Sequence, residues 1–302
     1  MPRLFDAYIM VDWSAASTPT TGKDSIWIGT LARSKSAEFA FEAVNPKTRL
    51  EARRILAEQI EALVAGGDRV LAGFDFAMGY PAGTAEAIGL TGGGKAPWAA
   101  MATLFETLLE ERADNSNSRF KVAAALNEMI TGGPHPFWGA PQSKVSGHLS
   151  AKKGDFSTGI AEHRLAEAWI RATFKAVPKS VWQLAYNGAV GSQALLGIPA
   201  VHDLRSMIAG SQIWPFETGL KPLTEDALEN VTCVFAEIYP STIDPVLEPG
   251  EILDRAQVRT LSNHLQMLDQ AGKLADAFGP PDSLDTRKIT QVEVEEGWIL
   301  AK

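Results

Sequence analysis

Residues 7–14 read AYIMVDWS, a short apolar run that ends in Asp12. Residues 69–76, RVLAGFDF, repeat this arrangement with Asp75, and residues 231–237, VTCVFAE, repeat it with Glu237. Buried parallel strands read as continuous apolar runs, and open α/β sheets bind ligands at the carboxyl ends of their strands. The three runs therefore predict strands that each carry one acid to the same edge of a sheet.

Between the first two runs lie two strands and one helix. Residues 25–31 and 38–44 have strand composition and are joined by hairpin-length loops. Residues 48–64 carry apolar side chains at helical spacing, and a glycine pair at 66–67 ends that helix. The order before Asp75 is thus three strands, a helix and a fourth strand, which predicts an α/β protein.

The rest of the chain is first helical and then alternating again. The middle predicts helices over 97–111, 119–130, 161–176 and the later part of 187–208, and a short strand at 212–216. After the strand that ends in Glu237, one helix is expected from about Asp254, as N-cap, to Phe278. We predict a single domain over 1–302, with a core of 1–81 and 231–302. A mainly helical insertion over 82–230 would cover the strand-end site and set substrate choice.

Composition restricts the class of protein. The 302 residues are 45% hydrophobic and 21% charged, as in ordinary globular proteins. The net charge of −8 disfavours coating of nucleic acid, which needs a basic face, although a local basic groove stays possible. The start, MPRLFDAYIM, lacks a signal-peptide core, and no apolar run reaches the ~18 residues of a membrane span. We expect a soluble cytoplasmic protein with no membrane partner, and the oligomeric state is left open.

Acids gathered at one sheet edge repel each other and need a counterion. Hard carboxylate oxygens favour Mg²⁺ or Mn²⁺, and two such ions ~4 Å apart would clamp the attacking and leaving oxygens of a phosphodiester. Each acid also has a simpler explanation: Asp12 and Asp75 could cap the turns that follow them, and Glu237 could pair with a lysine or arginine.

Short motifs carry a resemblance to a known family. VDWS at 11–14, GFDFAMGYP at 73–81 and EIYP at 237–240 resemble a family of predicted nucleases with an RNase H-like fold. EEGWI at 295–299 resembles the C-terminal ending of that family, and residues 179–199 resemble an insertion found in a subgroup. The resemblance implies a mixed sheet of three antiparallel strands followed by parallel strands, with helices on both faces.

The resemblance also implies a metal-dependent nuclease site. In that fold the first acid comes from strand one, matching Asp12, another from strand four, matching Asp75, and a last one from the closing helix. Asp269 and Asp276 lie on one face of the expected closing helix, and Asp269 is preferred because it lies farther from the helix end. The expected catalytic residues are Asp12, Asp75, Glu237 and Asp269, and Asp12, Asp75 and Asp269 would bind Mg²⁺ or Mn²⁺. The closing helix departs from the family in lacking a paired-acid motif.

Substrate-binding candidates lie mainly in residues 131–160, the most basic and aromatic loop of an acidic chain. A nucleic acid strand could stack on Phe137 or Trp138, with phosphates neutralised by lysines such as Lys144. The expected substrate-binding residues are Ser14, Trp138, Lys144 and His148. The alternative is a surface loop without a ligand.

Two glycine-rich stretches are weaker candidates for anion binding. Residues 187–191 lead into a helix and predict either an anion cradle or a tight turn. Residues 89–96, GLTGGGKA, approach a phosphate-binding P-loop but have Ala96 where the motif needs Ser or Thr.

Two functions of different class remain after this reasoning. The first is a divalent-metal-dependent nuclease or phosphodiesterase, in which water activated by the metal attacks phosphorus in single-stranded or structured nucleic acid or in a nucleotide. The second is a catalytically inactive RNase H-like protein that binds a small anionic ligand or a protein partner. A sugar-kinase-like phosphotransferase would need two duplicated domains and clear phosphate loops, which the sequence lacks. The acidic surface favours a small or locally gripped substrate.

Overall fold

The structure is a computed structural model that describes residues 3–33, 38–154, 159–174, 176–186 and 188–300. The strands are β1 Ala7–Asp12, β2 Trp27–Arg33, β3 Phe39–Val44, β4 Val70–Phe74, β5 Ser211–Ile213, β6 Cys233–Ile238 and β7 Ile299–Leu300. The helices are α1 Arg49–Ala65, α2 Thr84–Ala87, α3 Pro97–Leu108, α4 Arg119–Thr131, α5 Leu165–Phe174, α6 Gly191–Met207, α7 Leu253–Gln270, α8 Leu274–Ala277 and α9 Thr286–Gln291.

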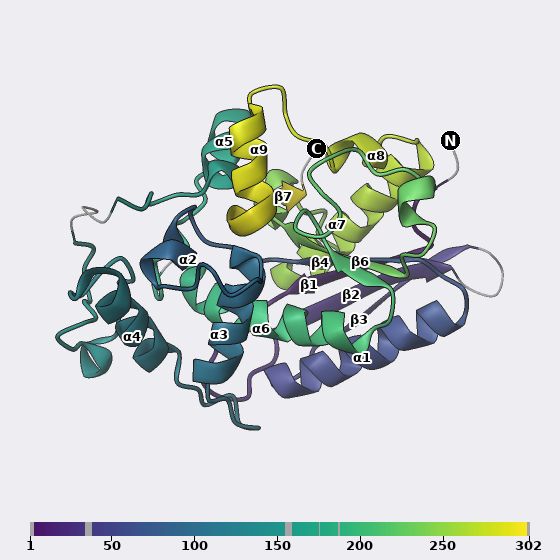
Figure 1. The fold of residues 1–302 in the computed structure, drawn as a ribbon. Helices are drawn as coiled ribbons and strands as arrows, with labels where there is room; N and C mark the ends of the chain where they lie inside the picture. The colour runs from purple at the N-terminus through teal and green to yellow at the C-terminus, as the bar shows by residue number, and fades with distance from the viewer. Residues whose placement is uncertain (1–2, 34–37, 155–158, 175, 187, 301–302) are drawn as a thin grey trace.

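The strands form one mixed sheet in the order β3-β2-β1-β4-β6-β5, with β7 also paired to β6 (Figure 1). β1 pairs antiparallel with β2, and β2 pairs antiparallel with β3. β1 pairs parallel with β4, and β6 pairs parallel with β4, β5 and β7. The predicted α/β class and the mixed sheet, antiparallel first and parallel afterwards, are confirmed.

Helices cover both faces of the sheet. The strand β1 has apolar side chains on both of its faces, and each face packs against a helix. Ile9 and Val11 belong to a buried cluster that includes Leu56 of α1, whereas Tyr8 and Met10 belong to a second cluster. That second cluster contains the α7 side chains Val258, Leu261 and Leu265. Successive strand residues face opposite sides, so a continuous apolar run is what a strand between two helical layers requires.

The segment predicted as a mainly helical insertion, 82–230, contains helices α2 to α6 joined by long loops, and it is built into the core. α2, α3 and α4 lie together at one end of the sheet, and α8 lies at the other end (Figure 1). From the same segment, α6 packs against α1 and α3, and β5 pairs with β6. The insertion therefore supplies a strand of the central sheet in addition to the helices.

The predicted helix from Asp254 to Phe278 is shorter in the structure. α7 ends at Gln270, and Gly272, with φ of 69°, interrupts the chain before the short α8. A positive φ is the conformation that glycine adopts readily at helix ends. No helix in the described part of the chain is long and apolar enough to cross a membrane.

Candidate functional site

Two of the predicted acids meet at the carboxyl edge of neighbouring parallel strands. Asp12 is the last residue of β1, and Asp75 directly follows β4. The register pairs Val11 with Phe74, and the backbone N–H of Asp75 donates to the Val11 carbonyl at 3.0 Å. Parallel pairing in this register brings both carboxyl groups to one edge, as the sequence predicts.

A third acid joins them from the first turn of α7. The Asp254 carboxylate accepts a hydrogen bond from the backbone N–H of Asp24 at 2.6 Å. The pKa of Asp12 is raised to about 8, mainly by burial and further by the charges of Asp254 and Asp24. Burial raises the pKa of Asp75 well above its ordinary value, and the charges of Asp12, Glu237 and Asp254 raise it further. Asp12, Asp75 and Asp254 therefore form an acid cluster whose members repel one another.

The structure does not bring Asp269 to this cluster, which corrects the prediction for the closing helix. Asp269 is buried, and its carboxylate accepts from the backbone N–H groups of Leu4 and Phe5, each at 2.9 Å, and from the Tyr8 hydroxyl at 2.6 Å. These groups lie at the start of β1, at the end of the sheet opposite to Asp12. Asp276, the alternative, belongs to α8 at that same far end (Figure 1).

Glu237 lies at the correct edge but is engaged in a buried ion pair. The Arg164 guanidinium donates to both carboxylate oxygens of Glu237, at 2.8 and 2.6 Å, and also to Glu167. The backbone N–H of Met78 donates to Glu237 at 2.9 Å. Burial raises the pKa of Glu237, and Arg164 acts in the opposite direction. The predicted alternative, a pairing of Glu237 with a lysine or arginine, is confirmed, and this acid anchors the loop that follows Asp75.

A cavity of about 390 Å³ opens beside Asp75. One side is the carboxyl edge of the sheet, with Asp75, Glu237 and Tyr239 and the nearby Arg164 and Glu167, and the other side consists of residues 177–179, 186, 188–190 and 193. Gln193 of α6 joins the two, because it lines the cavity and donates through its side-chain amide to the Trp13 carbonyl at 2.6 Å. The loop before α6 and the first turn of that helix thus line the cavity from the side away from the strand ends.

The predicted substrate-binding residues of the 131–160 loop do not line this cavity. Trp138 is held by backbone hydrogen bonds with Trp182 and Leu184, and its buried indole N–H has no partner among the residues that the structure describes. Phe137, the other predicted stacking residue, is 1% exposed and therefore cannot stack on a ligand. Residues 155–158 of the loop lie outside the described residues.

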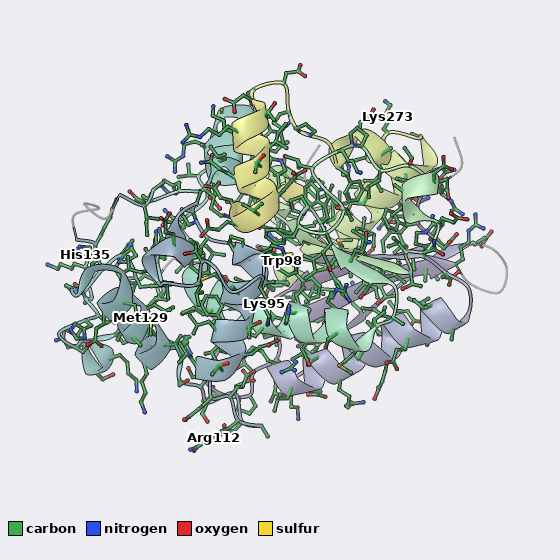
Figure 2. The ribbon with its side chains drawn as sticks, viewed as in Figure 1. Lys95, Trp98, Arg112, Met129, His135 and Lys273 are labelled. Atoms are coloured by element: carbon green, nitrogen blue, oxygen red, sulfur yellow. The ribbon has the colours of Figure 1, made fainter. Side chains whose placement is uncertain are left out.

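Lys144 and His148 occupy the outer side of the same loop. Lys144 is exposed, and the His148 imidazole lies 3.4 Å from the Glu128 carboxylate of α4. Figure 2 shows His135, near the start of the loop, at the α4 end of the molecule and far from Lys273. The loop thus lies at the end of the sheet where the acids are, but its predicted ligand residues are not part of the cavity wall.

Ser14 and the two glycine-rich stretches have different surroundings. Ser14 follows β1 directly, and its hydroxyl accepts from the Ala16 N–H at 3.3 Å, so it shapes the turn after Asp12. Lys95 donates to Thr103 of α3 at 3.1 Å, and Figure 2 shows it near Trp98. Its loop follows α2 and not a strand, unlike a P-loop. The other stretch lines the cavity from residue 188 onward, while Asn187 lies outside the described residues.

The donor set of the acid cluster fits a hard divalent cation. Mg²⁺ and Mn²⁺ prefer carboxylate oxygens, and Mg²⁺ is usually held by one or two carboxylates, with waters and substrate phosphates as the other ligands. In the ranges that the structure describes, no group of three or more His, Cys, Asp or Glu side chains could hold a metal ion. Asp12 and Asp75 supply two carboxylates at one edge of the sheet, and this donor set fits an ion whose other ligands are water or substrate.

The sequence contains a signal for Asp254 that the motif comparison missed. The chain leaves β6 at the carboxyl edge of the sheet, so the helix that follows it begins on that side and runs back across the sheet. Asp254 is the second residue of α7, whereas Asp269 lies about 22 Å farther along at 1.5 Å per residue. The acid nearest the start of the helix is thus the one expected at the site. Arg164, Lys179 and Tyr186 have no comparable signal, because they come from loops.

Comparison of the chain with protein-family models, with curated proteins and with solved structures finds no match. The functional argument therefore depends on the acid cluster and on the cavity next to it.

Proposed function

We propose that this protein is a divalent-metal-dependent phosphodiesterase or nuclease with an RNase H-like fold. One observation carries the proposal: Asp12, Asp75 and Asp254 come from three separate parts of the chain and gather at one sheet edge, where the charge of Asp254 raises the pKa of Asp12, and the charges of Asp12 and Asp254 raise the pKa of Asp75. Buried groups of like charge destabilise a folded chain, and strongly perturbed acids of this kind concentrate at functional sites. A divalent cation would relieve the repulsion.

The strand order supports the RNase H-like part of the proposal. Three antiparallel strands precede a helix and a parallel strand, and β1 lies between β2 and β4. The motifs at 11–14, 73–81 and 237–240 resemble a family with an RNase H-like fold, and in that fold acids come from strand one, strand four and the closing helix. Asp12, Asp75 and Asp254 occupy those three places, with Asp254 replacing the residue first expected.

Each residue has a distinct part in the proposed chemistry. Asp12 and Asp75 would hold Mg²⁺ or Mn²⁺, with Asp254 next to them, and the ion would supply Lewis-acid activation of a phosphate ester. The raised pKa of Asp12 means that this carboxyl exchanges a proton near neutral pH, so ion binding and proton release are linked. The Arg164–Glu237 pair positions the loop after Asp75 through the Met78 N–H.

A second function is favoured by one observation. The cavity beside Asp75 is lined by two cationic side chains, Arg164 and Lys179, which suits a catalytically inactive protein that binds a small anionic ligand. In that case the cavity beside Asp75 would be the binding site. The Asp12→Asn variant distinguishes the two functions. It abolishes cleavage if the protein is a phosphodiesterase, and it leaves ligand affinity largely intact if the protein only binds an anion.

The test is cleavage of a panel of DNA, RNA, nucleotides and a chromogenic phosphodiester with Mg²⁺ and with Mn²⁺. The proposal predicts cleavage that EDTA stops and that Asp12→Asn lowers at least about 100-fold. Asp282→Asn, which changes an exposed acid, is the matched control and should leave the rate unchanged. A panel left intact with both metals contradicts the proposal.

A further inference from the structure

The cavity beside Asp75 is lined on its strand-end side by Asp75 and by the ion pairs of Arg164 with Glu237 and Glu167, and on its other side by Lys179 and the amide of Gln193. Lys179 is exposed and lines the wall opposite the strand ends. Its aliphatic stem lies over Gly188, since a Cβ on that glycine would be 3.5 Å from the Lys179 Cγ. Gly188 has φ of 71°, and α6 begins three residues later without a side-chain cap on its first turn. Lys179 and the start of α6 thus present positive charge to the same space.

Aromatic surface completes the cavity. Tyr186 is 62% exposed, lines the cavity and has φ of 74°, a backbone conformation that is costly for a bulky residue. Tyr239, which follows β6, lines the cavity from the strand-end side. Strained residues cluster at ligand sites, and an exposed tyrosine face is a surface on which nucleobases stack.

The size of the cavity limits what it can hold. Its volume of about 390 Å³ is at the lower end of the ~300–1,000 Å³ typical of small-molecule pockets. Such a space accommodates one small ligand and not a length of duplex. The net charge of −8 agrees, because a protein with this excess does not track a long polyanion without a basic face.

We propose that this cavity binds a single nucleotide unit, with its phosphate between Lys179 and Asp75 and its base against Tyr186 or Tyr239. The inference rests on the proposed function. The Asp75 carboxylate alone repels a phosphate, whereas a cation held at Asp75 would attract it. The unit comes either from a free nucleotide or from the end of a single strand. These two sources share the same chemistry at the site.

The test is calorimetric titration of the full chain with Mg²⁺ and four probes: AMP, UMP, inorganic phosphate and a ten-residue oligonucleotide. AMP and UMP are expected to bind, and inorganic phosphate at least about tenfold more weakly, because it lacks a base to stack. Lys179→Ala is expected to weaken AMP binding about tenfold or more, and Tyr186→Ala about fivefold or more. Lys121→Ala, at an exposed lysine of α4, is the matched control and should leave affinity unchanged.

The ten-residue oligonucleotide is compared with a circular strand, which has no end, to identify the source of the nucleotide unit. Binding of AMP together with an open-ended strand supports a strand end, and binding of AMP alone supports a free nucleotide. Binding of a circular strand in the absence of AMP binding overturns the proposal, as does AMP affinity that Lys179→Ala leaves unchanged. AMP contains no phosphodiester bond, so its binding is measured without cleavage and the two failures are separable. AMP binding without cleavage of any substrate removes only the proposed activity, and cleavage without AMP binding removes only this inference.

Discussion

The carboxyl of Asp254, in the first turn of α7, lies close enough to the carboxyl of Asp12, at the end of β1, to raise its pKa. Burial is the largest cause, and together with Asp254 and Asp24 it raises the pKa of Asp12 to about 8. These two acids join opposite ends of the chain at one sheet edge. Their proximity distinguishes Asp254 from Asp269 as the acid that the closing helix contributes.

Substitution of Asp254 should lower metal affinity, whereas substitution of Asp269 should lower stability. Asp254→Asn is expected to weaken Mn²⁺ binding at least about tenfold, because it removes a charge from the acid cluster. Asp269→Asn should leave Mn²⁺ affinity within about twofold but lower the free energy of unfolding by roughly 1–3 kcal/mol, since Asp269 accepts three buried hydrogen bonds. Titration calorimetry and urea unfolding measure the two effects. Equal losses of metal affinity in both variants would contradict the placement.

The pH dependence of stability should report the raised pKa of Asp12. The native protein keeps a proton on this carboxyl up to about pH 8, whereas the unfolded chain loses it near the ordinary pKa of 3.8. The native state therefore binds more protons between these values, and its stability falls as pH rises from about 4 to about 8. In EDTA, Asp12→Asn should raise the free energy of unfolding by roughly 1–3 kcal/mol more at pH 8 than at pH 4. A difference that does not vary with pH would refute this assignment.

Loss of Arg164 should destabilise the fold strongly. Arg164→Met leaves Glu237 and Glu167 buried without their cation, which is expected to cost about 3–5 kcal/mol in the free energy of unfolding. Adding Glu237→Gln to that variant should restore part of the loss. The control is Arg54→Met, which breaks an exposed pair with Glu58 and should cost under about 0.5 kcal/mol. Urea denaturation checks all three, and an Arg164→Met loss no larger than the control's would show that the pair is not structural.

A side chain at Gly79 should disrupt the loop that follows Asp75. A Cβ at this position would lie 2.2 Å from the backbone carbonyl oxygen of Glu295, and backbone cannot move aside as a flexible side chain can. Gly79→Ala is therefore expected to lower the free energy of unfolding by about 2 kcal/mol or more. Gly93→Ala, where a Cβ meets nothing within 4 Å, should change it by less than about 0.5 kcal/mol. Equal thermal midpoints for the two variants would contradict the contact.

Much of the fold is predictable from the sequence because its strands are buried on both faces. The run that ends in Asp12 is apolar at consecutive positions, and the structure packs its alternate residues against α1 and α7. The position of β5 in the sheet does not follow from the sequence, because this strand has only three residues and its pairing with β6 is a tertiary contact. The early end of α7 depends on the positive φ of Gly272, which the apolar spacing across that position does not reveal.

The site was predictable only where an acid directly follows a strand. Asp12 and Asp75 are in this position, and the sheet register brings them together. The prediction that Asp269 lies at the acid cluster is wrong, because helical periodicity identifies a face of a helix but not which end of the helix lies near the carboxyl edge of the sheet. Lys179 and Tyr186 lie in a loop whose path depends on the packing of α6, so their place in the cavity wall follows from the tertiary structure alone.

The most direct test of the account is Mn²⁺ binding to the wild type, Asp12→Asn and Asp282→Asn, measured by titration calorimetry at pH 8. The account predicts that the wild type and Asp282→Asn bind Mn²⁺ with the same affinity and that Asp12→Asn binds at least about tenfold more weakly. Mn²⁺ affinity that is unchanged in Asp12→Asn, or absent from the wild type, would contradict a metal site at the acid cluster.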